Sequence, residues 1–266
     1  MSLPRALVTG AGGTFGRFIC AALVAHGFET LCVVRDAAKG EGLLSFLAAR
    51  APPGAAGRAR AITCDLSSRD DIARAIGGAL GGAPLDVLVN NAAVAHETRA
   101  LAADGTELQW AVNVLAYHRV LRAALPALRL AAAPRVVFVA SQYAGGLDLR
   151  DAQWAARPYE AHAAYKATKE ANRMLAAAWA AREPRLAVHA CHPGIADSAV
   201  ARGLGMAFAD DDATAAAGAA TPVFIATSAA LAPSGTYYVD KAPHSDKFAA
   251  DAAAVDALWA SVEAAA

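Results

Sequence analysis

A tyrosine and a lysine lie four residues apart in a stretch of sequence that predicts one long helix. No glycine or proline occurs between Glu160 and Glu183, and alanine is abundant there, which favours a helix over residues 161–183. Tyr165 and Lys169 then lie one turn apart on the same face. A phenol ionises near pH ~10, and a neighbouring ammonium lowers its pKa, so Tyr165 is a candidate proton donor or acceptor. The same spacing also fits an ordinary amphipathic helix, so the pair alone identifies no site.

The rest of the chain predicts alternating strands and helices. Apolar runs bounded by turn residues predict strands over residues 5–9, 29–34, 60–64, 85–89, 135–140, 186–191 and 235–239. Helices are expected over residues 17–26, 37–50, 68–80, 105–132, 161–183, 214–230 and 250–262, with Pro126 kinking the fourth. This alternation predicts an α/β fold, in which helices cover both faces of a parallel sheet. No repeat or long linker divides the chain, so we expect a single domain over residues 1–266.

Small and polar residues follow many of the predicted strands. Because ligands of a parallel sheet bind at the carboxyl ends of its strands, residues at these ends are candidate site residues. They are the segment Gly10–Gly16, Asp65, Asn90, Ser141 and Pro193-Gly194. Asp65 also fits a turn or a helix cap, and Asn90 also fits a turn. Their shared position in the fold is what favours a common site.

A glycine-rich turn joins the first predicted strand to the first predicted helix. Gly10, Gly12, Gly13 and Gly16 let the backbone approach a ligand, and the free N–H groups and dipole of the helix attract an anion. This arrangement predicts a cradle for the pyrophosphate of a dinucleotide. The spacing differs from the G-x-G-x-x-G pattern, so a purely structural turn is the alternative for this segment by itself.

Arg35 and Asp36 follow the second predicted strand, where a dinucleotide-binding fold places the adenosine ribose. An arginine there suits the 2′-phosphate of NADP, whereas an acid suits the ribose hydroxyls of NAD. We expect NADP(H) to be preferred through Arg35. NAD(H) is the alternative, if the carboxylate of Asp36 turns inward.

The composition argues against several other classes of protein. Lysine and arginine total 24, as do aspartate and glutamate, and the zero formal net charge argues against a nucleic-acid partner. The four cysteines are scattered, so we predict neither a disulfide framework nor a metal site. No apolar run has the length of a membrane span, and the first residues lack a signal-peptide pattern. We therefore expect a cytoplasmic protein.

Together, these motifs resemble those of the short-chain dehydrogenase/reductase family. Thr9–Gly16 resembles its T-G-x-x-x-G-x-G loop, Asn90–Ala93 its N-N-A-G motif, and Tyr165 with Lys169 its Y-x-x-x-K pair. Other segments are similar to the retinol-dehydrogenase-like branch of the family. They are residues 32–36, 64–68, 165–172, 192–194 and 234–240, together with the long spacer between Ser141 and Tyr165.

The resemblance implies a Rossmann-type doubly wound sheet of about seven strands in the order 3-2-1-4-5-6-7. It implies a nucleotide-binding half up to about residue 140 and a catalytic and lid part over about residues 141–266. The implied catalytic residues are Asn113, Ser141, Tyr165 and Lys169. The implied cofactor-binding residues are Gly10, Gly12, Gly13, Thr14, Phe15, Gly16, Arg35, Asp65, Leu66, Asn90, Ala92, Tyr165, Lys169, Pro193, Gly194 and Ile195.

The implied activity is hydride transfer between a nicotinamide cofactor and a carbonyl or alcohol. In the direction of reduction, Tyr165 protonates the developing alkoxide and Ser141 hydrogen-bonds the carbonyl oxygen. Lys169 lowers the pKa of Tyr165, and Asn113 anchors a water that relays protons to Lys169. The apolar residues of a predicted lid over residues 195–212 favour a hydrophobic substrate.

Departures from the family's pattern and two other functions qualify this expectation. Thr14 replaces the middle glycine of the loop motif and Ala93 the last glycine of N-N-A-G, so we expect a slightly reshaped cofactor pocket. A non-catalytic nucleotide-binding relative that acts as a regulatory or scaffold subunit stays open. So does an isomerase, epimerase or dehydratase on the same fold. Family members pair through two long helices, so we expect a homodimer or homotetramer built on helices 105–132 and 161–183.

Overall fold

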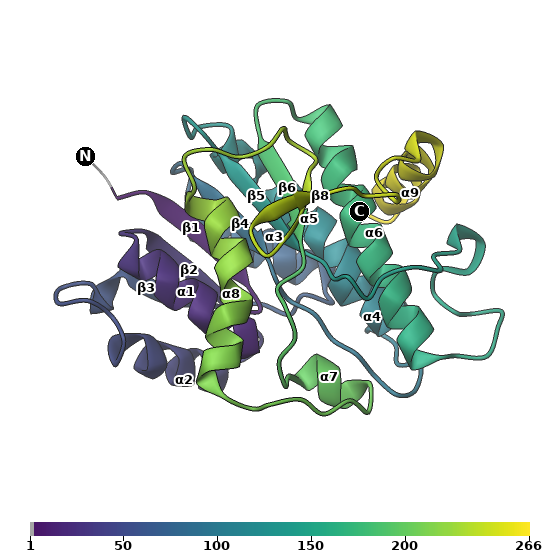
Figure 1. The fold of residues 1–266 in the computed structure, drawn as a ribbon, viewed down its shortest axis with the longest axis horizontal. Helices are drawn as coiled ribbons and strands as arrows, with labels where there is room; N and C mark the ends of the chain where they lie inside the picture. The colour runs from purple at the N-terminus through teal and green to yellow at the C-terminus, as the bar shows by residue number, and fades with distance from the viewer. Residues whose placement is uncertain (1–2) are drawn as a thin grey trace.

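In the computed structural model, which describes residues 3–266, eight strands form one sheet in the order β3-β2-β1-β4-β5-β6-β7-β8 (Figure 1). The strands are β1 (Arg5–Thr9), β2 (Glu29–Val34), β3 (Ala59–Thr63), β4 (Val87–Asn90), β5 (Arg135–Val139), β6 (Ala187–Cys191), β7 (Tyr237–Val239) and β8 (Ala242–His244). The first seven are parallel, and their predicted order is confirmed. The interior residues of β1, β4 and β5 are apolar because helices bury both faces of these strands.

The eighth strand was not predicted. β8 pairs antiparallel with β7, and the turn between them carries Asp240 and Lys241 at φ 48° and 65°. All three residues of β8 are exposed, and Pro243 is the middle one. A short exposed segment with a proline has no apolar alternation to detect, and proline is tolerated in a strand only at such an edge.

Helices cover both faces of the sheet, as expected. One face is covered by α1 (Thr14–Ala25), α2 (Ala37–Ala48) and α8 (Asp212–Thr227), and the other by α3 (Arg69–Leu80), α5 (Ala116–Leu128) and α6 (Ala161–Arg182). The remaining elements are η1 (Ala56–Arg58), α4 (Leu108–Trp110), η2 (Ala111–Leu115), η3 (Leu149–Asp151), α7 (Ala199–Gly203) and α9 (Ala252–Ala264). In Figure 1, α8 passes in front of the strands beside α1. No helix within residues 3–266 combines the length and the apolar character needed to cross a bilayer.

The helix predicted over residues 105–132 is interrupted. It consists of α4, the π-helical segment η2 and α5. The main irregularity is the change from α- to π-helix at Ala111. It is not at Pro126, which lies inside α5. Asn113 stands in the middle of η2, and its side chain is bonded to a neighbouring loop. Single π turns are often found at functional positions.

The C-terminal helix α9 packs on α6 and α5, at the edge of the molecule in Figure 1. Leu258 of α9 is completely buried, and the ring of Trp259 lies 4.9 Å from that of Trp179 on α6. Glu263 forms an ion pair of 2.9 Å with Arg122 of α5. Part of the helix surface that we expected to pair with another subunit is thus covered by the chain itself. Pairing through these two helices and the oligomeric state stay predictions.

We predict that Leu258→Ala destabilises the fold by about 2–5 kcal/mol, because it removes buried methyl groups and leaves a cavity between α9 and α6. Leu130→Ala is the matched control, since Leu130 is 60% exposed. It should change the free energy of unfolding by no more than about 0.5 kcal/mol. Denaturant unfolding of both variants and the parent measures the difference. Equal losses in the two variants would show that α9 does not pack as described.

Candidate active site

The glycine-rich loop between β1 and α1 brings two strand ends into close contact. Gly10 has φ +62°, and a Cβ atom there would lie 2.7 Å from the Cα of Ala92, which follows β4. A Cβ atom on Gly16 would lie 2.2 Å from the carbonyl oxygen of Gly10. Neither position has room for a larger residue. Both glycines are therefore required for the loop to turn tightly beneath the first turn of α1.

The N-terminus of α1 is left without a side-chain cap. Gly13 occupies the N-cap position and makes no side-chain bond. Within residues 3–266, every other α-helix that begins from a loop is capped by an Asp, Glu or Ser side chain. The first N–H groups of α1 thus have no capping partner and stay available for an anion, which the helix dipole also attracts. The arrangement fits the pyrophosphate of a dinucleotide.

Arg35 and Asp36 form a loose ion pair of 3.8 Å at the end of β2. The side chain of Arg35 is 71% exposed, whereas the carboxylate of Asp36 caps α2 by accepting a 2.8 Å hydrogen bond from the backbone N of Lys39. Asp36 is therefore engaged in the helix cap. Lys39 was not singled out in the sequence, although its Cβ lies 3.6 Å from the place of a Cβ on Gly12. This residue is a second cation beside the glycine-rich loop.

Two further predicted cofactor residues follow β3. The carboxylate of Asp65 accepts hydrogen bonds from the backbone N and the hydroxyl of Ser67, at 2.9 and 2.7 Å. Asp65 thus has the turn-forming role that the sequence allowed as the alternative to binding a cofactor. Ser68, and not Asp65, caps α3. Leu66 is half-buried and packs against the core on that face.

The amides after β4 connect that strand to its neighbours. Asn90 donates a 3.1 Å hydrogen bond from Nδ2 to the carbonyl of Tyr117, and its buried Oδ1 has no partner within residues 3–266. Asn91 donates from Nδ2 to the carbonyls of Thr9 and Gly10, at 2.9 and 3.2 Å. Asn91 therefore holds the start of the glycine-rich loop against β4. Asn90 leaves an acceptor free at the carboxyl end of the sheet.

Asn113 joins three segments of the site. Its Oδ1 accepts from the backbone N of Val94 at 2.8 Å, and its Nδ2 donates to the carbonyl of Val94 at 2.9 Å. Nδ2 also lies 3.2 Å from the hydroxyl of Thr168, which in turn donates to the carbonyl of Tyr165 at 2.7 Å. The side chain of Asn113 thus positions the loop after β4 against α6, next to Lys169.

Tyr165 and Lys169 lie on one face of α6, and both are buried, at 9% and 2% exposure. Nζ of Lys169 lies 5.6 Å from the centre of the Tyr165 ring and donates a 3.1 Å hydrogen bond to the carbonyl of Val139. Burial raises the pKa of Tyr165 above its usual value and lowers the pKa of Lys169 to about 7. The expectation that Lys169 lowers the pKa of Tyr165 is therefore wrong for the protein chain by itself. Loss of hydration is the main cause of both pKa shifts.

Tyr117 is a buried neighbour of this pair that sequence analysis missed. It follows Asn113 by four residues, and its hydroxyl donates to the same Val139 carbonyl, at 3.1 Å. Nζ of Lys169 lies 5.7 Å from the centre of its ring. Burial raises the pKa of the Tyr117 phenol, so it remains a neutral donor. A spacing of four residues from Asn113 was the signal that would have indicated Tyr117.

Ser141 follows β5 and faces the start of α6. Its Oγ accepts a 2.9 Å hydrogen bond from the backbone N of Tyr143, and no acceptor within residues 3–266 takes the hydroxyl proton. The phenol of Tyr143 lies 3.0 Å from Nδ1 of His162, in the first turn of α6. The backbone N of Gly145 also bonds to the carbonyl of Lys166, at 3.1 Å. These contacts hold the loop after Ser141 against the helix that carries Tyr165.

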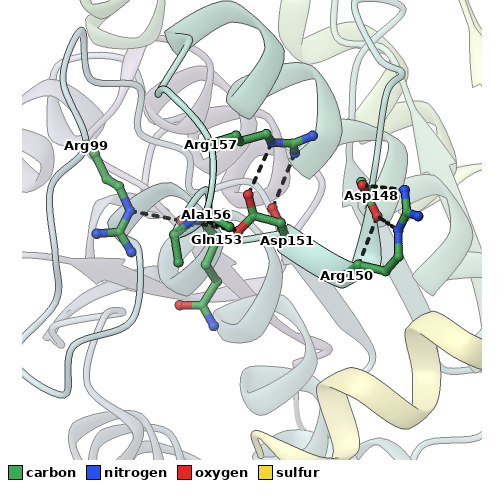
Figure 2. Close-up of polar contacts among 8 residues, drawn as sticks. Arg99, Asp148, Arg150, Asp151, Gln153, Ala156 and Arg157 are labelled. Atoms are coloured by element: carbon green, nitrogen blue, oxygen red, sulfur yellow. Dashed lines mark hydrogen bonds and ion pairs between the residues drawn. The ribbon is translucent and has the colours of Figure 1, made fainter.

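The long spacer before Tyr165 is folded against the loop that precedes α4. Figure 2 shows Arg99 donating to the carbonyl of Gln153, at 3.0 Å, and Arg157 paired with the carboxylate of Asp151, at 3.5 Å. A second connection is Glu107, whose backbone N donates to the side chain of Gln153 at 3.1 Å. These contacts hold the spacer against the loop that precedes α4.

The predicted lid covers Tyr165 from the other side. Pro193, Gly194 and Ile195 follow β6, with Gly194 at φ +99°, and the chain then forms the short helix α7. Leu204 packs with Tyr165 and Ala95, and three partly buried apolar residues complete the cluster: Ala161, Val200 and Met206. Tyr165 is thus packed against aliphatic side chains.

Comparisons with known proteins agree with this geometry. The family model described as short chain dehydrogenase matches residues 4–209. A protein named probable oxidoreductase from Streptomyces antibioticus is 38% identical over 199 residues, covering 71% of this chain and 63% of that protein. Mouse retinol dehydrogenase 13 is 30% identical over 207 residues, covering 75% of this chain and 60% of that protein. The chain therefore spans less than two thirds of the length of these relatives.

Solved structures show the same fold over most of the chain. An uncharacterized protein from Mycobacterium paratuberculosis superposes with a TM-score of 0.79 at 26% identity, covering 99% of this chain and 95% of that chain. A metagenomic short-chain oxidoreductase in complex with NADP superposes with a TM-score of 0.57 at 28% identity, covering 72% and 82%. The chain belongs to the short-chain dehydrogenase family, and it is similar to the retinol-dehydrogenase-like branch.

The lowered pKa of Lys169 predicts a stability that depends on pH. Between about pH 7 and the ordinary lysine pKa near ~10.4, the folded chain binds fewer protons at Lys169 than the unfolded chain does. Burial of Lys169 therefore destabilises the fold most below pH ~7, and the cost disappears as the pH rises through this window. Lys169→Met should raise the Tm at neutral pH, by an amount that decreases towards pH ~10. The Val139 carbonyl keeps its bond from Tyr117.

Thermal unfolding of the cofactor-free parent and variant between pH 6 and 9.5 measures this difference. Lys247→Met, on an exposed lysine, controls for the effect of a new methionine. If the advantage of Lys169→Met were the same at every pH, the lowered pKa of Lys169 would be refuted.

Proposed function

We propose that this chain is an oxidoreductase that transfers a hydride between NADP(H) and a hydrophobic carbonyl compound or alcohol. The observation that carries the proposal is the position of Tyr165 and Lys169. They lie buried one turn apart on α6, and Lys169 is bonded to the last residue of β5. The family match supports the reaction class.

Each proposed catalytic group has a role that its contacts support. Tyr165 is a neutral phenol because burial raises its pKa, so it can donate a proton to a developing alkoxide. The hydroxyl of Ser141 already accepts from Tyr143, which leaves its own proton to bind the carbonyl oxygen of a substrate. Lys169 holds or relays protons behind Tyr165, and Asn113 anchors a water that relays them to Lys169. A bound nicotinamide supplies or accepts the hydride.

The residues proposed to hold the cofactor lie along the carboxyl ends of β1 to β6. The uncapped N-terminus of α1 suits the pyrophosphate. Arg35 and Lys39 offer cations to a 2′-phosphate, while Asp36 is engaged in capping α2. Structural relatives in complex with NADP and with NADH both exist, so the preference for NADP(H) rests on these residues.

The substrate is proposed to be hydrophobic because the groups around the phenol of Tyr165 are aliphatic. Leu204, Ala95 and Met206 belong to the apolar cluster beside it. The alternatives are a non-catalytic nucleotide-binding subunit and an isomerase, epimerase or dehydratase. Oxidation or reduction of cofactor in proportion to product separates the proposed reaction from both. A cytoplasmic location and a homodimer or homotetramer remain predictions.

Replacing the phenol should remove the proton donor without changing the shape of the site. We predict that Tyr165→Phe lowers kcat by roughly 10²- to 10⁴-fold and leaves cofactor affinity within about twofold. Rates are measured with a panel of carbonyl compounds and NADPH, and affinity by fluorescence titration. Tyr237→Phe is the matched control, because the buried hydroxyl of Tyr237 has no partner within residues 3–266. Turnover by Tyr165→Phe within a few-fold of the parent would exclude Tyr165 as the acid.

The second prediction concerns the choice of cofactor. Arg35→Ala should lower kcat/KM with NADPH by roughly ten- to a hundredfold and leave the value with NADH nearly unchanged, because one charge-assisted contact to the 2′-phosphate is lost. Lys39→Ala should have a smaller effect in the same direction. Arg50→Ala is the control, since Arg50 is paired with Asp212. A parent that prefers NADH, or a preference that Arg35→Ala does not alter, contradicts the assignment.

A further inference from the structure

Thr14 stands where the loop motif of the family has a glycine, and its hydroxyl makes a contact that glycine cannot make. It is the first residue of α1, and its Oγ1 donates a 3.2 Å hydrogen bond to the carbonyl oxygen of Asp197. These two residues are 183 positions apart in the chain. The bond therefore connects the glycine-rich loop directly to the segment that follows β6.

Asp197 forms the base of the lid. Its backbone N donates a 3.3 Å hydrogen bond to the carbonyl of Ala209, so the two ends of residues 197–209 are joined. Its carboxylate forms an ion pair with Arg202 of α7. Thr14 bonds to the remaining backbone group of Asp197, its carbonyl. All three interactions meet at this one residue, which is 8% exposed.

The body of the lid packs directly on the proposed catalytic phenol. Leu204 lies against Tyr165 and Ala95 in one apolar cluster. A Cβ atom on Gly203 would lie 2.2 Å from the carbonyl oxygen of Ala95, so the end of α7 fits closely against the loop after β4. A small shift at the base of the lid would therefore move the apolar wall beside Tyr165.

We propose that Thr14 is a positioning residue, and that its hydroxyl holds the lid segment 197–209 closed over Tyr165. This role rests on the proposed function, because the lid shapes the site only if a substrate binds beside Tyr165. The residue acts through Asp197 and Leu204 and takes no part in proton or hydride transfer.

Limited proteolysis tests the proposal without substrate or cofactor. Arg202 is the only lysine or arginine in residues 197–209, and its side chain is 60% exposed, so trypsin reports opening of the lid by cutting after it. Thr14→Val removes the donor and keeps the shape, and should speed this cut by roughly two- to tenfold, the effect of losing one neutral hydrogen bond. Thr14→Ser keeps the donor, and trypsin should cut this variant after Arg202 at the same rate as the parent. Peptides are identified by mass spectrometry.

Thr14→Gly gives a second variant without the donor, in case valine disturbs the start of α1. Cuts at sites outside the lid serve as the internal reference for global stability. Unchanged cutting after Arg202 in both Thr14→Val and Thr14→Gly overturns the proposal. Faster cutting at all sites overturns it as well, since the effect would then be a general loss of stability.

Steady-state kinetics provide the functional readout. In Thr14→Val the KM for the carbonyl substrate, measured at saturating NADPH, should rise by a factor similar to that of the proteolysis rate, because Leu204 of the lid packs beside Tyr165. Thr14→Ser should restore the KM. A fall in kcat at constant KM overturns the role in positioning the lid. If the parent has no activity, the proposed function fails, and the cut after Arg202 still decides whether Thr14 holds the lid.

Discussion

The hydrogen bond from Lys169 to the carbonyl of Val139 is the contact on which the site depends. It attaches α6 to the end of β5, two residues before Ser141, and so sets the distance between the loop that carries the serine and the helix that carries the tyrosine. A buried lysine is costly unless its donors find acceptors. The backbone carbonyl of Val139, the last residue of β5, supplies one acceptor. Tyr117 donates to the same oxygen and closes the network from the side of α5.

Burial, more than the proximity of charged groups, determines the direction of the pKa shifts of Tyr165 and Lys169. It raises the pKa of Tyr165 and lowers the pKa of Lys169 to about 7. Both shifts favour the neutral forms, which is the expected result of removing water from a phenol and an amine together. A neutral phenol is the form that donates a proton in the reductive direction. Oxidation requires the phenolate form of Tyr165, so another group must compensate for the lost hydration. The aliphatic side chains around Leu204 do not do so.

The lid and helix α9 pack against different ends of α6. The lid lies over the N-terminal part of the helix, where Tyr165 is located. Helix α9 packs on the C-terminal part through Trp259 and Trp179. The helix is thereby enclosed along much of its length, and no residue over 161–180 is exposed.

The sequence by itself determined the frame of this protein. Local periodicity and turn residues located seven strands and most of the helices, because these signals depend only on neighbouring residues. The positions of Gly10, Asn90, Ser141 and Tyr165 at strand ends or on α6 followed from the same pattern. Only the tertiary structure decided the rest: the antiparallel β8, the π segment around Asn113, the packing of α9, and the connections of Tyr117 and Thr14. Each of these depends on contacts between residues far apart in the chain, and the direction of the pKa shifts depends on how completely the fold excludes water.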